Sequence, residues 1–148
     1  MARLEVPLRG RTLQSTGDEV LHAVLDLEVK TDQGTWVIVR FRVDPGTEMT
    51  TMPAQVARDL HLPIPRRPVR GLSFRGQQVR RGLLRARIPG LDANEYVFTC
   101  YFLGDPYVPL ADPRNLLGLT GVIDQVRLIF DGTRSISAPN GILVIENI

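Results

Sequence analysis

Apolar and polar side chains alternate along much of the chain, a pattern typical of β-strands that bury one face. Residues 25–30 read LDLEVK, and residues 37–43 read VIVRFRV. Between these two runs, TDQGT supplies the Asp and Gly that favour a tight turn. We therefore expect two antiparallel strands joined in a hairpin.

Four more segments with strand-like composition follow, separated by clusters of Gly, Pro, Asn and Asp. They are RRGLLRARI (80–88), EYVFTCYFL (95–103), QVRLIF (125–130) and GILVIENI (141–148). Many short strands at close spacing are typical of all-β barrels and closed sandwiches. The pattern thus predicts an all-β fold, either a closed β-barrel or a closed sandwich.

Two segments depart from the period of two. After Pro53, which the first turn of a helix tolerates, AQVARDLHL places its apolar residues on one side of a short helix. The segment NLLGLTGVIDQV (115–126) is a second candidate, although Gly118 and Gly121 lower its helix propensity. We expect one or two short helices, and a loose N-terminal arm or edge strand in the less regular residues 1–20.

The composition indicates one globular domain. The chain has 148 residues, 43% of them apolar, which is enough for an ordinary core, and we place the domain at residues 21–148. No segment has the basic start and apolar run of a signal peptide, and none has about 18 apolar residues in sequence, so we expect a cytoplasmic protein without a membrane span. The single cysteine, Cys100, lies in an apolar run and is expected to be a buried, unreactive thiol.

Positive charge is concentrated in one segment. Residues 66–87 contain eight arginines and no acidic residue, although the net charge of the chain is only +2. The segment is either a solvated strand face or a contact for an acidic substrate or partner. A nucleic-acid-binding β-barrel is a further alternative, with Phe74 stacking on bases beside arginines that contact phosphates. Because one aromatic residue alone interrupts the basic run, we expect nucleic acid not to be the partner.

Several classes of site have no support in the sequence. His22 and His61 are 39 positions apart, and no His or Cys has the spacing of metal ligands, so we expect no metal and no cofactor. No serine lies in a G-x-S-x-G motif, and no glycine-rich phosphate loop opens a helix. Serine hydrolysis and nucleotide binding therefore have no identifiable residues.

Asp44 is the strongest candidate for a functional side chain. Asp-Pro-Gly between two strand-like runs is, taken alone, a turn in which Asp accepts a backbone hydrogen bond and Gly adopts positive φ. The surrounding order favours more than a turn. An apolar strand leads into Asp44, a hydroxyl residue follows Gly46, and a short strand and a helix that starts at Pro53 come next.

This order resembles that of the single-domain, retroviral-type (retropepsin-like) aspartic peptidases. The stretch FRVDPGTEMTTMPAQVARDLHL is similar to the family's strand, Asp-Thr/Ser-Gly loop, second strand and helix. NLLGLTGVIDQVRLIFDG is similar to the apolar-apolar-Gly motif near the family's C-terminus, with Leu116, Leu117 and Gly118 at the motif positions. Between them, VRGLSFRGQQVRRG falls where the family has its flap, and its tip is near Phe74, Arg75 and Gly76. The resemblance covers about residues 21–148.

The resemblance implies an aspartic endopeptidase that is active as a two-fold homodimer of closed β-barrels. Peptide hydrolysis by this chemistry needs one carboxylate to accept a proton from water and a neighbouring carboxylic acid to donate one. The chain has one loop of the right form, so the second acid is expected to be Asp44 of a second copy. Gly46 would allow close approach of substrate, Thr47 would support the carboxylate, and residues 70–82 would form the flap. Residues 141–148 are the expected intersubunit strand.

Pro45 departs from the family pattern, which has Thr or Ser at that position. Proline has neither the hydroxyl nor the backbone N–H with which those residues bond across the dimer. The expected consequence is a weaker dimer or a slower enzyme. A catalytically impaired peptide-binding or regulatory protein of the same fold is therefore an alternative function.

Overall fold

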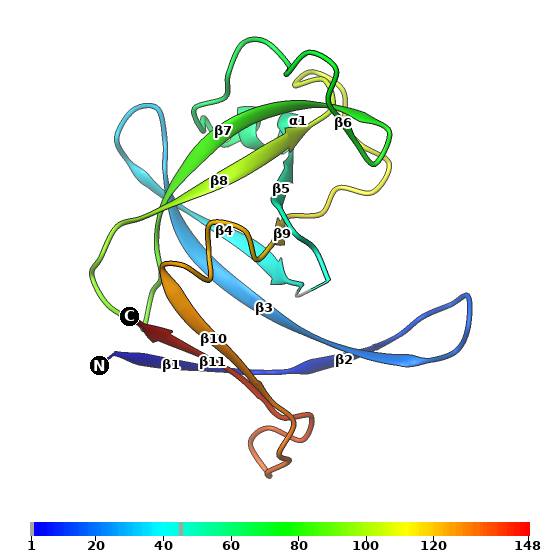
Figure 1. Cartoon of the computed structure of the whole chain (residues 1–148), viewed down its shortest axis with the longest axis vertical. Coiled ribbons are helices and arrows are strands. Elements are labelled where there is room, and N and C mark those ends of the chain that lie inside the picture. Colours follow the sequence, from blue (N-terminus) through cyan, green and yellow to red (C-terminus); the bar gives the residue numbers. More distant parts are fainter. Residues whose placement is uncertain (1, 45) are drawn as a thin grey trace.

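The computed structural model describes residues 2–44 and 46–148, and within them the chain is all-β with one short helix (Figure 1). The elements in chain order are β1 (Arg3–Pro7), β2 (Arg9–Thr12), β3 (Glu19–Lys30), β4 (Trp36–Val43), β5 (Thr50–Pro53), α1 (Ala54–Asp59), β6 (Ser73–Phe74), β7 (Gln77–Arg87), β8 (Tyr96–Leu103), β9 (Leu116–Leu117), β10 (Val126–Asp131) and β11 (Ile142–Asn147). In this part of the chain no helix is long and apolar enough to cross a membrane.

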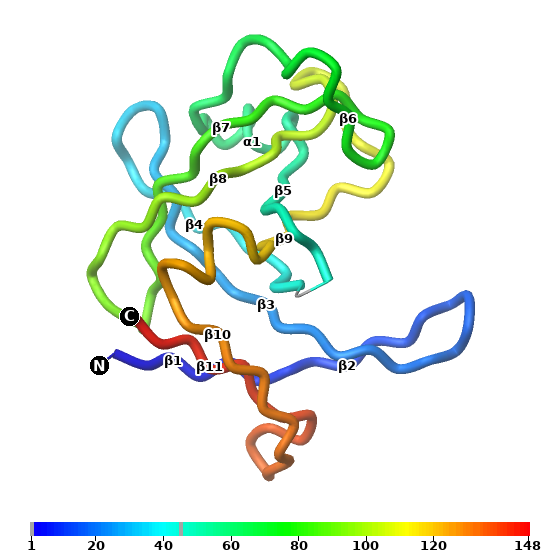
Figure 2. The backbone as a smooth tube through the Cα atoms, in the orientation of Figure 1, coloured from blue at the N-terminus to red at the C-terminus, as the bar shows by residue number. Residues whose placement is uncertain are grey.

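The strands form two sheets. The smaller has the order β1-β11-β10, and the larger has the order β2-β3-β4-β9-β5-β8-β7-β6 with an additional pairing of β3 with β7. The longest strand, β3, runs from the projecting β2–β3 hairpin across the middle of the molecule (Figure 2). The all-β class is confirmed, whereas a closed barrel stays a prediction.

The alternating segments bury one face, as the pattern predicted. In the antiparallel β3–β4 pair, Leu25 lies opposite Phe41 and Leu27 opposite Val39, and all four side chains are buried. Cross-strand apolar pairs of this kind stabilise a sheet because they exclude water from one face together. Cys100 on β8 belongs to the same core, and its burial raises the pKa of the thiol far above the ordinary value. The expected burial of the thiol is thus confirmed, and the raised pKa is consistent with the low reactivity expected of it.

The C-terminal strand lies inside the smaller sheet. Along β11, Ile145 pairs with Leu4 of β1 on one edge and with Leu128 of β10 on the other. Both chain ends consequently lie side by side (Figure 1), and the Ala2 N–H donates to Asn147 Oδ1 at 2.9 Å. The expectation that residues 141–148 pair with a second copy is corrected, because both hydrogen-bonding edges of β11 are occupied within one chain.

The second predicted helix is not formed. Leu116 and Leu117 make the short strand β9, which runs parallel to β4 and antiparallel to β5. A series of turns follows, in which Val122 N–H donates to Leu119 O at 3.0 Å and Val126 N–H donates to Val122 O at 3.0 Å. The prediction for residues 115–126 was wrong because sheet pairing holds the two leucines extended.

Candidate active site

Asp44 follows the last residue of β4, and its backbone is held by β9. Arg42 and Val43 pair with Leu116 and Leu117, and the Asp44 N–H donates to Leu117 O at 3.2 Å. The pairing extends the sheet to the first residue of the loop, so the backbone of Asp44 is held at the end of a paired strand. Asp44 is half-buried there.

Both oxygens of the Asp44 carboxylate accept hydrogen bonds from the loop that follows. The Gly46 N–H donates to Oδ1 at 2.9 Å, and Thr47 Oγ1 donates to Oδ2 at 3.1 Å. Thr47 is only 5% exposed, so its hydroxyl has little access to water as a competing partner. A side chain at position 46 would begin 3.2 Å from Asp44 Oδ1, closer than most such contacts. Gly46 and Thr47 therefore fix the orientation of the carboxylate, while Pro45 lies outside the described residues.

The segment after β9 crosses the same loop at very short range. The Gly118 N–H donates to Thr50 Oγ1 at 3.1 Å, Leu119 N–H to Thr47 O at 3.2 Å, and Thr120 N–H to Glu48 O at 2.8 Å. A Cβ on Gly118 would lie 2.6 Å from Met49 O and 2.8 Å from Glu48 O, which real Cβ atoms do not tolerate. Only glycine lets the two backbones approach in this way.

Thr50 is the contributor to the site that sequence reasoning missed. Its side chain is fully buried, and its hydroxyl accepts a hydrogen bond from the Gly118 N–H. The sequence feature that could have identified Thr50 is the run TEMTTM at the Asp44 loop, in which three of six residues are threonine.

Arginines surround the strand end that carries Asp44. Partial burial and then the neighbouring Arg11 and Arg114 lower the pKa of Arg42, and the Asp44 carboxylate partly opposes that shift. Burial, followed by the charges of Arg42, Arg11 and Arg9, also lowers the pKa of His22 on β3. Asp44 therefore lies close enough to Arg42 for the two charges to interact.

Replacing Thr47 with Val tests the support of the carboxylate. Valine keeps the shape but removes the donor to Asp44 Oδ2, so we expect the free energy of unfolding to fall by about 1–2 kcal/mol, typical of a hydrogen bond to a charged group that is partly solvated. Urea denaturation measures the loss. Thr47→Ser keeps the hydroxyl and should recover most of it; a Val variant as stable as the wild type would contradict the role given to this hydroxyl.

His22 should make stability depend on pH. Because its pKa in the folded chain is below the ordinary 6.5, the unfolded chain binds this proton more readily. The stability that neutral His22 contributes to the folded chain is therefore fully present above pH 6.5. It is lost as the pH falls from that value to the folded-state pKa. We expect His22→Gln to lose less stability than the wild type between pH 7 and pH 5, as measured by urea denaturation. Parallel curves for the two proteins would contradict this.

The predicted flap segment forms a hairpin. Ser73 and Phe74 of β6 pair with Gln78 and Gln77 of β7, and the turn between them has positive φ at Arg75 (54°) and Gly76 (75°). Positive φ at both central residues is the geometry of the tight hairpin turn that matches strand twist. The Phe74 ring packs edge-on against Tyr101 at 5.9 Å, and the Arg75 guanidinium lies 5.3 Å from its centroid. These contacts occupy the ring, so it is poorly placed to stack on a nucleic-acid base.

Within residues 2–44 and 46–148, no three His, Cys, Asp or Glu side chains are grouped so that they could hold a metal ion. What the Asp44 loop offers is a half-buried carboxylate whose two oxygens are held by one backbone N–H and one hydroxyl. A carboxylate oriented in this way can take part in proton transfer to or from water.

The sequence matches no protein-family model and no curated protein. The structure is similar to the crystal structure of a retropepsin-like aspartic protease from Rickettsia conorii, with a TM-score of 0.57 and 13% identity. The similarity covers 97% of this chain and 89% of that chain. At such low identity the comparison establishes the fold, which is the all-β, retropepsin-like fold expected from the motifs.

Proposed function

We propose that the chain is an aspartic endopeptidase that is active as a homodimer, with Asp44 of each copy forming the catalytic pair. The observation that carries the proposal is the Asp44 loop, in which both carboxylate oxygens are hydrogen-bonded by Gly46 and Thr47. The similarity of the fold to a retropepsin-like aspartic protease supports it. The additional pairing of β3 with β7 supports closure of the larger sheet into a barrel.

The chemistry requires a second carboxyl group beside the first. Two carboxyls in contact share one proton, because both cannot ionise together, and the pair then supplies a base and an acid. Asp131 is unsuited as the partner, since it lies on β10 in the smaller sheet and accepts the Thr133 N–H at 2.9 Å. A second copy related by two-fold symmetry would bring an identical Asp44 loop to the axis.

In the proposed enzyme one Asp44 takes a proton from water, the water attacks the peptide carbonyl, and the protonated Asp44 of the other copy donates to the carbonyl oxygen. Gly46 leaves room for substrate backbone, and the hairpin of residues 70–82 serves as the flap. The dimer would pair through the outer edges of β1 or β10, because β11 is enclosed between them.

Peptide cleavage tests the proposal. We expect the wild type to cleave members of a peptide library at acidic pH, and Asp44→Asn, which keeps the size of the side chain, to cleave none. A solution mass of two chains at micromolar concentration should accompany activity. The alternative, a peptide-binding protein without catalysis, is suggested by Pro45 and would show binding by both proteins and cleavage by neither.

A further inference from the structure

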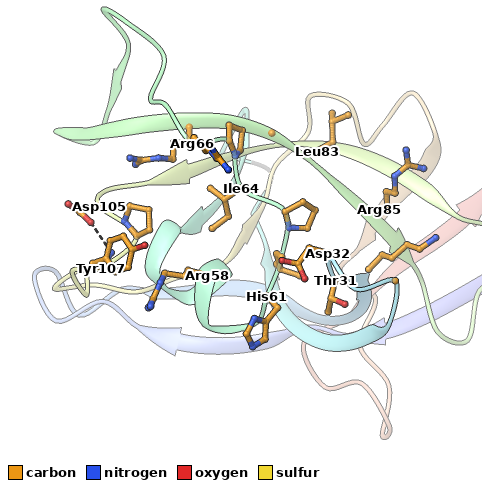
Figure 3. Close-up of a pocket in the computed structure, with 18 residues that line it drawn as sticks. Thr31, Asp32, Arg58, His61, Ile64, Arg66, Leu83, Arg85, Asp105 and Tyr107 are labelled. Atoms are coloured by element: carbon orange, nitrogen blue, oxygen red, sulfur yellow. Dashed lines mark hydrogen bonds between the residues drawn. The ribbon is translucent and has the colours of Figure 1, made fainter.

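A wide groove is lined by residues from the β3–β4 turn, α1 and β7 (Figure 3). It has a volume of about 1160 Å³ and is bounded by the β3–β4 turn, the end of α1, residues 61–66, the middle of β7 and residues 105–107. The β3–β4 turn precedes β4 and Asp44 follows it, so the eight residues of this strand, roughly 25 Å at 3.3 Å each, separate the two. The end of the groove at this turn is therefore distant from Asp44, whereas its lining residues Arg80 and Gly82 belong to residues 70–82, the proposed flap.

Positive charge dominates the walls of the groove. Five cationic side chains and two carboxylates, Asp32 and Asp105, line it; the cations are Lys30, Arg66, Arg80, Arg58, which pairs with Asp59, and Arg85, which pairs with Glu95. Arg80 is 9% exposed and donates to Gly104 O at 2.9 Å. Along the described residues, neither Lys30 nor Arg66 has a carboxylate within ion-pair distance. An anionic ligand would supply the missing counter-charge.

Apolar side chains also line the groove. Ile64 lies near the middle of the view in Figure 3, and Pro65 and Leu83, which is 50% exposed on β7, are further lining residues. At one end the Arg58 guanidinium lies 4.3 Å from the centroid of the Tyr107 ring. The groove thus combines cationic side chains with exposed apolar surface, which matches a chain that carries both carboxylates and apolar side chains.

We propose that this groove binds an acidic peptide segment with interspersed apolar residues, supplied by a substrate or partner protein. Its volume exceeds the range of about 300–1000 Å³ that is typical of small-molecule pockets, which favours an extended segment. A nucleic acid fits less well: among the described lining residues Tyr107 is the one Phe, Tyr or Trp, and Arg58 already covers its ring. The assignment does not depend on the proposed peptidase activity.

Binding of a labelled peptide of alternating Glu and Leu to the full-length Asp44→Asn chain tests the proposal, because this variant should leave the peptide intact. We expect Arg66→Glu to weaken binding about tenfold or more, because it removes a cation without an intramolecular counter-charge and puts an anion in its place. Arg134→Glu is the matched control, since it makes the same charge change at an exposed residue between β10 and β11. It should alter affinity less than about twofold. Thermal unfolding verifies that both variants are folded.

Two further probes decide the identity of the ligand. A peptide with Gln in place of Glu should lose most of the affinity, whereas a single-stranded oligonucleotide of equal charge should not displace the acidic peptide. Equal weakening by Arg66→Glu and Arg134→Glu would overturn the assignment, as would tight, groove-dependent binding of the oligonucleotide. Loss of peptidase activity would leave the assignment intact, because the binding experiment uses a protein without a complete acid pair.

Discussion

Mixing wild-type chains with Asp44→Asn chains should lower peptidase activity by more than the reduced share of wild-type chains alone would. If each active centre needs one Asp44 from each of two copies, an equal mixture that has exchanged subunits contains roughly a quarter of wild-type dimers, so activity should fall to about that fraction instead of a half. The pure Asp44→Asn protein should lose about a thousandfold or more in kcat/KM, because both the base and the acid are removed.

The control is a mixture of wild type with Thr47→Ser, which keeps the acid and the hydroxyl and should follow simple proportion. Activity that declines linearly with the share of Asp44→Asn would mean that one chain suffices, and the pairing of Asp44 residues would be wrong. Measurement of initial rates at fixed total protein separates the two cases.

Gly118→Ala should be the most destabilising single methyl addition in the Asp44 region. The new Cβ would lie 2.6 Å from Met49 O and in contact with Met49 C, and both are backbone atoms that cannot rotate away. Separating the two segments would weaken the bonds from Leu119 to Thr47 O and from Thr120 to Glu48 O. We expect a loss of about 2–4 kcal/mol in the free energy of unfolding, at the upper end for an overpacking substitution.

Gly132→Ala is the matched control, because a Cβ there would meet no atom within 4 Å and its φ is not in the left-handed region. Its free energy of unfolding should change by less than about 0.5 kcal/mol. Urea denaturation of the two alanine variants provides the comparison. Equal stability of both would show that the crossing of the Asp44 loop by residues 118–120 is looser than described.

Local patterns were sufficient for most of the strands. The alternation of apolar and polar residues in β3, β4 and β7 reflects the one buried face of each strand. The segment TDQGT between β3 and β4 contains the Asp and Gly residues typical of a turn. The helix α1 likewise follows from Pro53 and the apolar spacing behind it. In these elements the local preference and the tertiary environment agree.

The failures have a common physical cause. A two-residue strand such as β9 has no periodicity of its own, and its pairing with β4 joins residues more than 70 positions apart. The pattern in residues 115–126 is therefore ambiguous until the partners are known. The same holds for β11, whose apolar sequence indicates burial but not whether its neighbours belong to its own chain.

The site was predictable in part. The order of residues around Asp44 indicated the loop, and Gly46 and Thr47 lie on the carboxylate where the motif suggested. The contact between Gly118 and Met49 and the groove at Arg66 could not be foreseen, because each is assembled from segments that are distant in sequence. No local sequence pattern predicts contacts between such distant segments.

Because β11 is enclosed between β1 and β10, the fold of one copy does not require pairing of this strand with a second copy. Since β1 and β10 satisfy both of its edges, β11 completes its backbone hydrogen bonding within one copy. If the proposed dimer is the active form, isolated copies would be folded but inactive, and the local concentration of the protein would determine how many active centres form.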